Sequence, residues 1–370
     1  MRVESVTTTL VDLPFPKPIG TAIHAMSSTG CCVVTLRCAD GLVGRSHLFT
    51  INADRLKSFE EMVRGLGEAF VVGRDIRHTE AIWHDVFRAV NPAGQAGVTI
   101  SALSTLDVAC WDAVGRALEQ PLHMLWGACR DSVDTYASSG LWLSATIDEL
   151  QTQAAAFVRQ GFRAVKIRVG HDDRNIDAKR VAAVRDAVGS NVKILVDANQ
   201  KYRPVDAIAL GRALHETLAP AGPVWLEEPV ATHDRDGHAV VRRALNQLGI
   251  PIATGESEYT RHGARDMMAA GACDVYMPDL QRVGGYSEFR KVAAACATNG
   301  IGVSSHFFTE QSLCLAGSID NCISVEHIDW FSPLFNEEMA LVDGRLVIPD
   351  LPGTGFSYNP DALDRYRIGT

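Results

Sequence analysis

The chain has 370 residues, of which 46% are hydrophobic and 21% are charged, and its formal net charge is −9. This composition is typical of a globular protein with one large or two smaller domains, and the lack of a Lys- and Arg-rich cluster excludes nucleic acid as an expected partner. No apolar segment approaches the roughly 18 residues of a membrane span, and nine scattered cysteines without a CxxC pair fit a reducing compartment, so we expect a cytoplasmic protein without a membrane partner.

The first third of the chain is predicted to be an α+β domain that spans residues 1–127. Residues 2–12 and 31–47 have the alternation and apolar content of strands. The stretch between them is rich in Gly, Pro, Ser and Thr, which predicts a mobile loop. Apolar residues then recur at helical spacing in three segments, 53–70, 79–90 and 99–118.

From about residue 132 the sequence alternates short apolar segments with stretches of helical periodicity. This alternation predicts parallel strands joined by right-handed crossovers, and eight such strands predict a closed (β/α)8 TIM barrel of the α/β class rather than an open sheet. The barrel is expected to span 128–330, and the Pro- and Gly-rich residues 331–370 are expected to pack back on the first domain. The candidate strands are 134–139, 164–170, 193–199, 224–229, 251–256, 275–279, 302–306 and 323–327.

Three acidic residues lie at the carboxyl ends of successive predicted strands. Asp197, Glu227 and Glu256 are 30 and 29 residues apart, which is about one strand–helix unit each. In a barrel this spacing places three carboxylates side by side at the mouth, where active sites are built. One such residue alone is more often a helix cap or a solvated loop residue. Three in succession repel one another unless a cation lies between them, and ligation by oxygen alone favours Mg²⁺.

The next two predicted strands end in a candidate acid–base pair. Asp279 ends the sixth strand and His306 the seventh, so the two side chains can form a hydrogen bond. A carboxylate that holds one imidazole nitrogen raises the basicity of the ring and leaves the other nitrogen free as a general base.

Further charged residues point toward the same barrel mouth. Lys166 and Arg168 are two residues apart on the second strand, so both face the barrel interior, where they need a negative partner such as a substrate carboxylate. Glu326 ends the eighth strand, and in its protonated form it is expected to donate a hydrogen bond. Together, these groups predict removal of a proton next to a carboxylate through a stabilised enediolate.

The motifs resemble those of the enolase superfamily, and within it the mandelate racemase subgroup; the superfamily uses a Lys or His base with Mg²⁺. The resemblance implies a capping domain over the barrel mouth, Mg²⁺ bound by the acidic trio, an Asp279–His306 dyad and a Lys166 contact with the substrate carboxylate. It also implies a homo-oligomer and places Asn199 near the substrate 2-hydroxyl. The motifs are, in chain order, FRAVKIRVG, LVDAN, WLEEP, ATGE, MPDLQRVGG, VSSHFF and SVEHID.

The same resemblance implies a lid that shapes substrate specificity, formed by the loop around Ile23, His24 and Met26. The apolar residues expected around the pocket would suit a more hydrophobic 2-hydroxy acid, as in mandelate. These apolar residues are Ile23, Met26, Ile51, Trp142 and Ile328, whereas His24 supplies a polar contact.

Arg168 departs from the Lys-x-Lys pattern of the racemases, because a guanidinium stays protonated and is a poor base. Chemistry from His306 alone resembles that of the acid-sugar dehydratases, which form 2-keto-3-deoxy acids, and we expect this lyase reaction. A racemase, epimerase or lactone cycloisomerase acting on a mandelate-like 2-hydroxy acid or a sugar acid is the alternative. A barrel that binds a carboxylate without turning it over is a third possibility.

Overall fold

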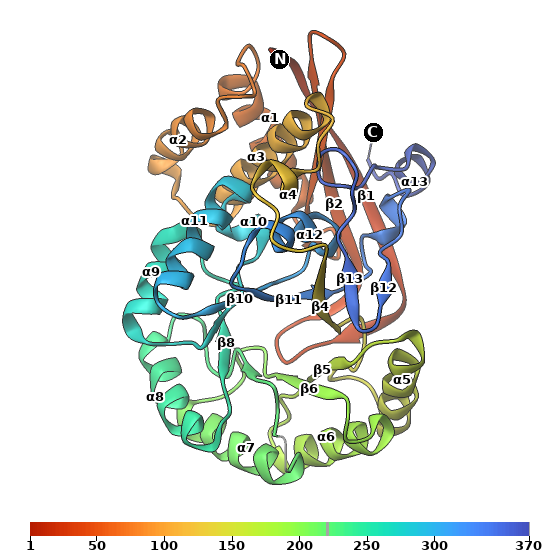
Figure 1. The fold of residues 1–370 in the computed structure, drawn as a ribbon, viewed down its shortest axis with the longest axis vertical. Coiled ribbons are helices and arrows are strands. Elements are labelled where there is room, and N and C mark those ends of the chain that lie inside the picture. Colours follow the sequence, from red (N-terminus) through yellow and green to blue (C-terminus); the bar gives the residue numbers. More distant parts are fainter. Residues whose placement is uncertain (220–221, 370) are drawn as a thin grey trace.

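Two sheets organise the chain in the computed structural model, which describes residues 1–219 and 222–369. The first is antiparallel, in the order β1 (Val3–Gly20), β2 (Ala25–Cys38) and β3 (Val43–Ile51). The second contains eight parallel strands, β4 to β11, and closes because β11 pairs with β4. Figure 1 shows this barrel beneath the N-terminal sheet and its helices.

Each of the eight predicted barrel segments forms a strand, so the barrel prediction is confirmed. Six of the eight strands, β5 to β10, are shorter than predicted, because their carboxyl ends leave the ladder and turn into the loops of the barrel mouth. Asp279 and His306, for example, form only an isolated bridge. Their bounds are β4 (Ser132–Ala137), β5 (Ala164–Arg168), β6 (Lys193–Asp197), β7 (Leu226–Glu227), β8 (Ile252–Thr254), β9 (Val275–Tyr276), β10 (Gly302–Ser305) and β11 (Cys322–His327).

Helices follow the first seven barrel strands and bury one face against them. Local signals set their ends: Thr146 and Glu149 form a capping box at the start of α5, and Gly161 ends it in the left-handed region at φ 105°. In the described part of the chain β11 leads into a 3-10 turn, Ser332–Leu334, rather than an eighth α-helix. The barrel helices are α5 (Ile147–Gln160), α6 (Arg174–Val188), α7 (Pro204–Thr217), α8 (Arg235–Leu245), α9 (Thr260–Ala270), α10 (Leu280–Val283), α11 (Gly285–Thr298) and α12 (Thr309–Ser318).

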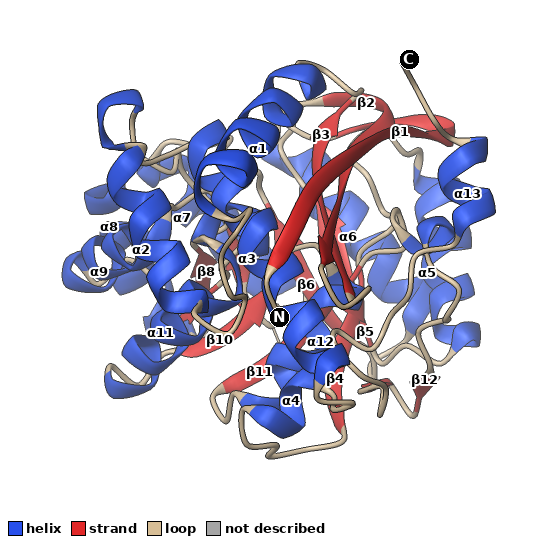
Figure 2. Ribbon diagram, turned by 90° about the horizontal axis from the view of Figure 1, so that it is seen from above, coloured by secondary structure: helices blue, strands red, loops and turns tan. Residues whose placement is uncertain are grey.

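The three predicted helices of the first domain are also present. They are α1 (Leu56–Phe70), α2 (Thr79–Ala89) and α3 (Val98–Ala117), followed by the short α4 (Leu122–Leu125). The helix α3 is buried along most of its length because it packs against β3 on one side and against α10 and α11 of the barrel on the other. In the view of Figure 2, α1 lies beside the three long strands, opposite α13 (Pro360–Arg365).

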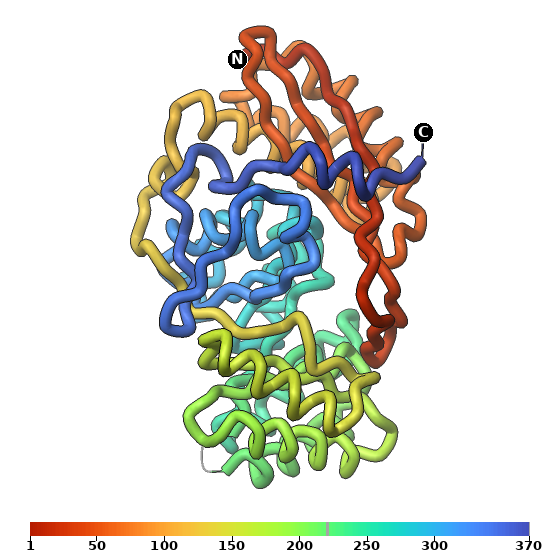
Figure 3. Tube along the Cα trace, turned by 90° about the vertical axis from the view of Figure 1, so that its right-hand side faces the viewer, coloured from red at the N-terminus to blue at the C-terminus, as the bar shows by residue number. Residues whose placement is uncertain are grey.

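The loop predicted between residues 12 and 31 is a long hairpin instead, so that prediction is wrong. The strands β1 and β2 continue past the sheet and turn only at residues 21–24. Pro14, Pro16 and Pro18 alternate with other residues near the end of β1, and among the described strands β1 pairs only with β2. Proline is tolerated on such an edge strand because the missing N–H faces away from the partner. Figure 3 shows the red hairpin reaching down toward the barrel.

The C-terminal tail runs back to the N-terminal sheet. It first forms the hairpin β12 (Leu341–Val342) and β13 (Arg345–Val347), which pairs with β4. The N–H of Ile368 then donates to the carbonyl of Leu10 at 2.9 Å, and the blue tail crosses the red strands in Figure 3. None of the described helices is both long and apolar enough to cross a lipid bilayer.

Asp107 of α3 caps the barrel helix α11 from the neighbouring domain. Its carboxylate accepts the N–H of Ser287 at 3.0 Å and the hydroxyl of Ser287 at 2.6 Å, and the contact is buried. Asp107→Ala is therefore expected to lower the free energy of unfolding by about 1–3 kcal/mol, because two buried donors lose their acceptor. Urea denaturation checks this, with Asp40→Ala in an exposed turn as the control; equal stability of the two variants would contradict it.

Candidate active site

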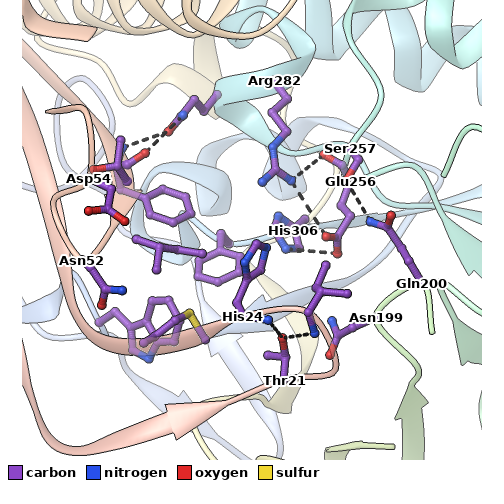
Figure 4. A pocket seen from close by; sticks show the side chains of 18 of the residues that line it. Thr21, His24, Asn52, Asp54, Asn199, Gln200, Glu256, Ser257, Arg282 and His306 are labelled. Carbon is purple, nitrogen blue, oxygen red and sulfur yellow. Dashed lines mark hydrogen bonds and ion pairs between the residues drawn. The ribbon is translucent and has the colours of Figure 1, made fainter. Parts of the chain in front are cut away.

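A cavity of about 500 Å³ opens at the carboxyl end of the barrel, beneath the tip of the β1–β2 hairpin and the loop after β3. Figure 4 shows side chains from both domains converging on it. Most of the residues predicted for the site line this cavity: Ile23, His24, Met26, Ile51, Trp142, Lys166, Arg168, Asp197, Asn199, Glu256 and His306.

Four predicted site residues do not line the cavity. Glu227, Asp279 and Glu326 are fully buried, and each contacts a residue that does line it. Ile328 is different, because it belongs to the hydrophobic core. Ile328 is not part of the cavity wall. Its N–H donates a hydrogen bond to the hydroxyl of Thr309 in α12 at 3.0 Å. The structure therefore does not support the prediction that Ile328 contacts substrate.

Lys166 lies at the centre of the acidic residues. Its Nζ is 2.7 Å from Glu326, 2.8 Å from Glu227 and 3.6 Å from Asp197, and the residue is 1% exposed. Burial alone would lower the pKa of Lys166, but Glu227 and Glu326 together raise it well above its usual range. Lys166 is thus a fixed cation in the floor of the cavity.

The donor set of the site fits a hard divalent cation. Asp197 and Glu227 are direct neighbours in the β6–β7 ladder, and burial raises the pKa of Glu227 to about 8, although Lys166 opposes this shift. Buried carboxylates outnumber the lysine and arginine side chains beside them, so an oxygen-binding cation such as Mg²⁺ would balance their charge. The buried carboxylates are Asp197, Glu227, Glu228, Asp279 and Glu326, joined by the partly buried Glu256, and the basic side chains are Lys166, Arg168 and Arg282.

The acidic trio does not surround one common point in this structure. Across residues 1–219 and 222–369, no three acidic, histidine or cysteine side chains are arranged to hold a metal ion. The reason lies in their partners: Glu227 is paired with Lys166, and an oxygen of Glu256 lies 3.2 Å from Nε2 of His306. A shared ion would require these carboxylates to exchange their present partners for it.

His306 and Asp279 form the expected dyad contact. Nδ1 of His306 lies 2.8 Å from Oδ2 of Asp279, and Asp279 is held in turn by the N–H of Arg282 at 2.9 Å. Burial lowers the pKa of His306, but Glu256 and the Asp279 hydrogen bond outweigh it and raise the pKa to about 8. The ring is therefore oriented by Asp279, with Nε2 on the side of the cavity.

The turn after His306 is held in an unusual backbone conformation. Phe307 and Phe308 have φ values of 50° and 48°, in the left-handed region that bulky residues rarely adopt. The N–H of Phe307 donates to Glu326 at 2.9 Å, and its ring packs 5.1 Å from Phe49 of β3. The capping domain therefore supports the segment that carries the histidine.

Glu326 acts as an acceptor in this structure, and its role as a protonated donor to substrate stays a prediction. It accepts hydrogen bonds from Ser138 and from the N–H of Phe307, and it pairs with Lys166. Burial would raise the pKa of Glu326, but Lys166, His306 and Arg168 hold it well below its usual range. The cations that surround Glu326 could not be inferred from its position at a strand end.

Arg168 is a fixed side chain in the cavity wall. Its Nη1 donates to the carbonyls of Ser138 at 2.7 Å and Gly140 at 3.0 Å, and its guanidinium stacks 4.0 Å from the centre of the Trp142 ring. Nε lies 3.8 Å from Asp197. Held in this way and permanently charged, Arg168 provides positive charge but no base.

Sequence reasoning missed several residues of the site. Arg282 donates to the carbonyl of Glu256 at 3.0 Å, and Gln281 accepts the N–H of Phe49 at 2.9 Å. Both belong to the motif MPDLQRVGG and lie two and three residues after Asp279, and this position in the motif could have predicted their place in the site. Trp330 lines the cavity after β11 without any such signal.

The structure thus combines a closed parallel barrel, paired acidic and basic groups at its mouth and a separate capping domain. Residues 5–127 match the family of N-terminal domains of mandelate racemase and muconate lactonizing enzyme. Residues 149–362 match the family described as enolase C-terminal domain-like. The chain belongs to the mandelate racemase and muconate lactonizing enzyme group of the enolase superfamily, and the predicted resemblance is confirmed.

Similar proteins include enzymes of several activities. The chain is 32% identical to a 3,6-anhydro-alpha-L-galactonate cycloisomerase of Streptomyces coelicolor, over 99% of this chain and 100% of the relative. It is 30% identical to an L-talarate/galactarate dehydratase of Salmonella typhimurium, over 98% and 90%. A crystal structure of the Salmonella enzyme with Mg and L-lyxarohydroxamate superimposes with a TM-score of 0.91 at 29% identity, covering 100% of this chain and 93% of that one.

Proposed function

We propose that this protein removes the proton next to the carboxylate of an acid sugar and eliminates water, giving a 2-keto-3-deoxy acid. One observation carries the proposal: His306 is oriented by Asp279 at 2.8 Å and lines the cavity, while the other candidate base position holds Arg168, which stays protonated. The dehydratase of Salmonella typhimurium supports it as a relative that covers nearly the whole chain.

Asp197, Glu227 and Glu256 would hold a Mg²⁺ ion, as their excess of negative charge suggests. When bound, such an ion polarises the substrate carboxylate and stabilises the charge of the enediolate. The Salmonella relative was crystallised with Mg, which supports the same requirement here.

The residues of the chain supply the remaining steps. Lys166, buried beside Asp197, stabilises negative charge on the substrate carboxylate. His306 accepts the α-proton and, as an imidazolium, returns a proton to the departing β-hydroxyl as the C–O bond breaks, which releases one water and leaves an enol. The enol then tautomerises to the 2-keto-3-deoxy acid, so that the net change is loss of one water. Asn199 donates to Asp197 at 3.2 Å, and its Oδ1 is buried without a hydrogen-bond partner among the described residues. This oxygen can accept a hydrogen bond from a substrate hydroxyl.

A cycloisomerase, racemase or epimerase is the second candidate, because it would use the same proton abstraction. The aromatic wall formed by Trp142, Phe307 and Trp330 favours a ring-shaped or less polar substrate, and the Streptomyces relative is named a cycloisomerase. A panel of sugar acids and lactones with Mg²⁺ tests both. Formation of 2-keto acid supports the lyase, and α-deuterium exchange or ring opening without 2-keto acid supports the isomerase.

Exchange at the α-carbon is expected for only one of two C2 epimers. The base His306 contacts Asp279 on one side of the cavity, and the guanidinium of Arg168 on the Trp142 wall has no proton-accepting atom. NMR in D₂O with both epimers of an active sugar acid measures this selectivity. Exchange of both epimers at similar rates would show that a second base operates and would reject the one-base mechanism.

We also infer a cytoplasmic homo-oligomer. All nine cysteines are free thiols, which supports a reducing compartment. Leu118, Met124 and Leu125 are 50%, 51% and 37% exposed around the short α4, which supports contact with a second copy of the chain. Light scattering coupled to size-exclusion chromatography tests the assembly, and a monomeric mass at micromolar concentration would reject it.

A further inference from the structure

The tip of the β1–β2 hairpin extends beyond the sheet that supports its base. Pairing between β2 and β3 reaches only the Thr29–Ile51 position, and the β1–β2 ladder is irregular between Pro14 and Ile19. The remaining ribbon, residues 19–28, has two strands, and an isolated ribbon of this kind is marginally stable. Some other contact must hold this tip against the cavity.

Asn52 directly follows β3 and makes hydrogen bonds to β2 beyond the point where β3 ends. Its Oδ1 accepts the N–H of Ser27 at 2.7 Å and that of Ser28 at 3.4 Å, and its Nδ2 donates to the carbonyl of Ala25 at 3.1 Å. Its own N–H donates to the carbonyl of Ser28 at 3.0 Å. One residue therefore engages the ribbon backbone on both sides of Met26, a buried residue of the cavity wall.

The backbone of Asn52 suits this role. Its φ of 55° lies in the left-handed region, which asparagine adopts more readily than most residues. In this conformation the chain turns away from β3, while the side-chain amide offers a donor and an acceptor as a peptide group would. Asn52 therefore combines a left-handed backbone conformation with a side-chain amide that makes the kind of hydrogen bonds a neighbouring strand would make.

The opposite side of the tip is fixed to the barrel. The N–H of Gly20 donates to the hydroxyl of Ser144 at 3.1 Å, and the carbonyl of Gly20 accepts the N–H of Leu143 at 3.0 Å. Between the two attachments, the hydroxyl of Thr21 accepts the N–H of His24 at 3.1 Å. Figure 4 labels Thr21, His24 and Asn52 along this border of the cavity.

We propose that Asn52 is a positioning residue that holds the hairpin tip over the cavity and thereby sets the affinity for substrate. The inference rests on the proposed function of the cavity, because the tip is treated as a wall of the substrate site. Asn52 acts through the backbone from Ala25 to Ser28. Its loss should loosen that wall without altering His306 or the acidic residues.

Asn52→Gly tests the proposal because glycine keeps the left-handed backbone and removes the side chain. Hydrogen exchange of the amides of residues 25–28 is expected to become about tenfold faster, and KM is expected to rise more than kcat falls. Asn52→Asp keeps the acceptor for Ser27 but loses the donor to Ala25, so its effects should be intermediate. Asp343→Gly is the matched control, since Asp343 also has a left-handed φ, 52°, in an exposed turn.

The outcomes separate this proposal from the proposed function. Unchanged exchange at residues 25–28 in Asn52→Gly would overturn the positioning role, and so would a general loss of protection across the whole chain. Faster local exchange with an unchanged KM would overturn the effect on substrate affinity. If no sugar acid is turned over, the proposed function fails, but exchange in the free protein still decides whether Asn52 holds the tip.

Discussion

Replacing His306 with asparagine is expected to lower turnover by about 10³-fold or more, a loss typical of a general base. Asparagine preserves much of the volume of the buried ring and can still donate a hydrogen bond to Asp279, which lies 2.8 Å from the native Nδ1. It has no group that accepts a proton at neutral pH. Steady-state assay of 2-keto acid formation, together with α-deuterium exchange, measures the loss.

Two controls make the His306 result specific. Mg²⁺ binding, followed by calorimetry, should persist in His306→Asn, because the imidazole is not among the proposed oxygen ligands. His262→Asn removes an exposed histidine on α9 and should leave turnover unchanged. Near-normal exchange in His306→Asn would show that another residue takes the proton.

Replacing Lys166 with methionine is expected to make the stability of the protein depend strongly on Mg²⁺. The substitution leaves Glu227 and Glu326, which lie within 2.8 Å of the native Nζ, without their buried cation. Removing one partner of a buried ion pair typically costs about 3–5 kcal/mol. We expect a loss of this size in EDTA at alkaline pH, where both carboxylates are ionised, and a partial recovery when Mg²⁺ binds the native state.

Thermal unfolding with and without Mg²⁺ checks this expectation. Lys193→Met serves as the control, because Lys193 is an exposed lysine on the neighbouring strand β6. The control should behave like the unaltered protein in both buffers. If Lys166→Met is equally stable in EDTA and in Mg²⁺, the carboxylates beneath the cavity do not share a divalent ion.

The barrel could be predicted because each unit repeats one pattern, an apolar strand followed by an amphipathic helix. The hairpin could not, because its composition is that of a loop. Pro14, Pro16 and Pro18 argue against a central strand, and only the tertiary structure shows that β2 is the one described strand that pairs with β1. For these residues the composition predicts a loop, whereas their pairing in the folded chain makes them a strand.

The site was predictable where a residue ends a strand, since topology alone brings strand ends together. Contacts that depend on domain packing gave no such signal. Phe49 and Phe307 are far apart in sequence, and their rings meet only because β3 docks over the seventh barrel strand. Glu326 shows the same limit for charge: its position was predictable, whereas its ionised state depends on Lys166 and its other neighbours.

The returning tail restricts how a substrate can reach the cavity. The N-terminal domain is connected to the barrel once through α4 and again where Ile368 bonds to Leu10, and the carbonyl of Gly353 also accepts the N–H of Leu122. A domain attached at both chain ends and along α3 resists swinging open as a rigid body. We therefore expect substrate to enter and product to leave when the hairpin tip bends locally, while the rest of the N-terminal domain stays in place.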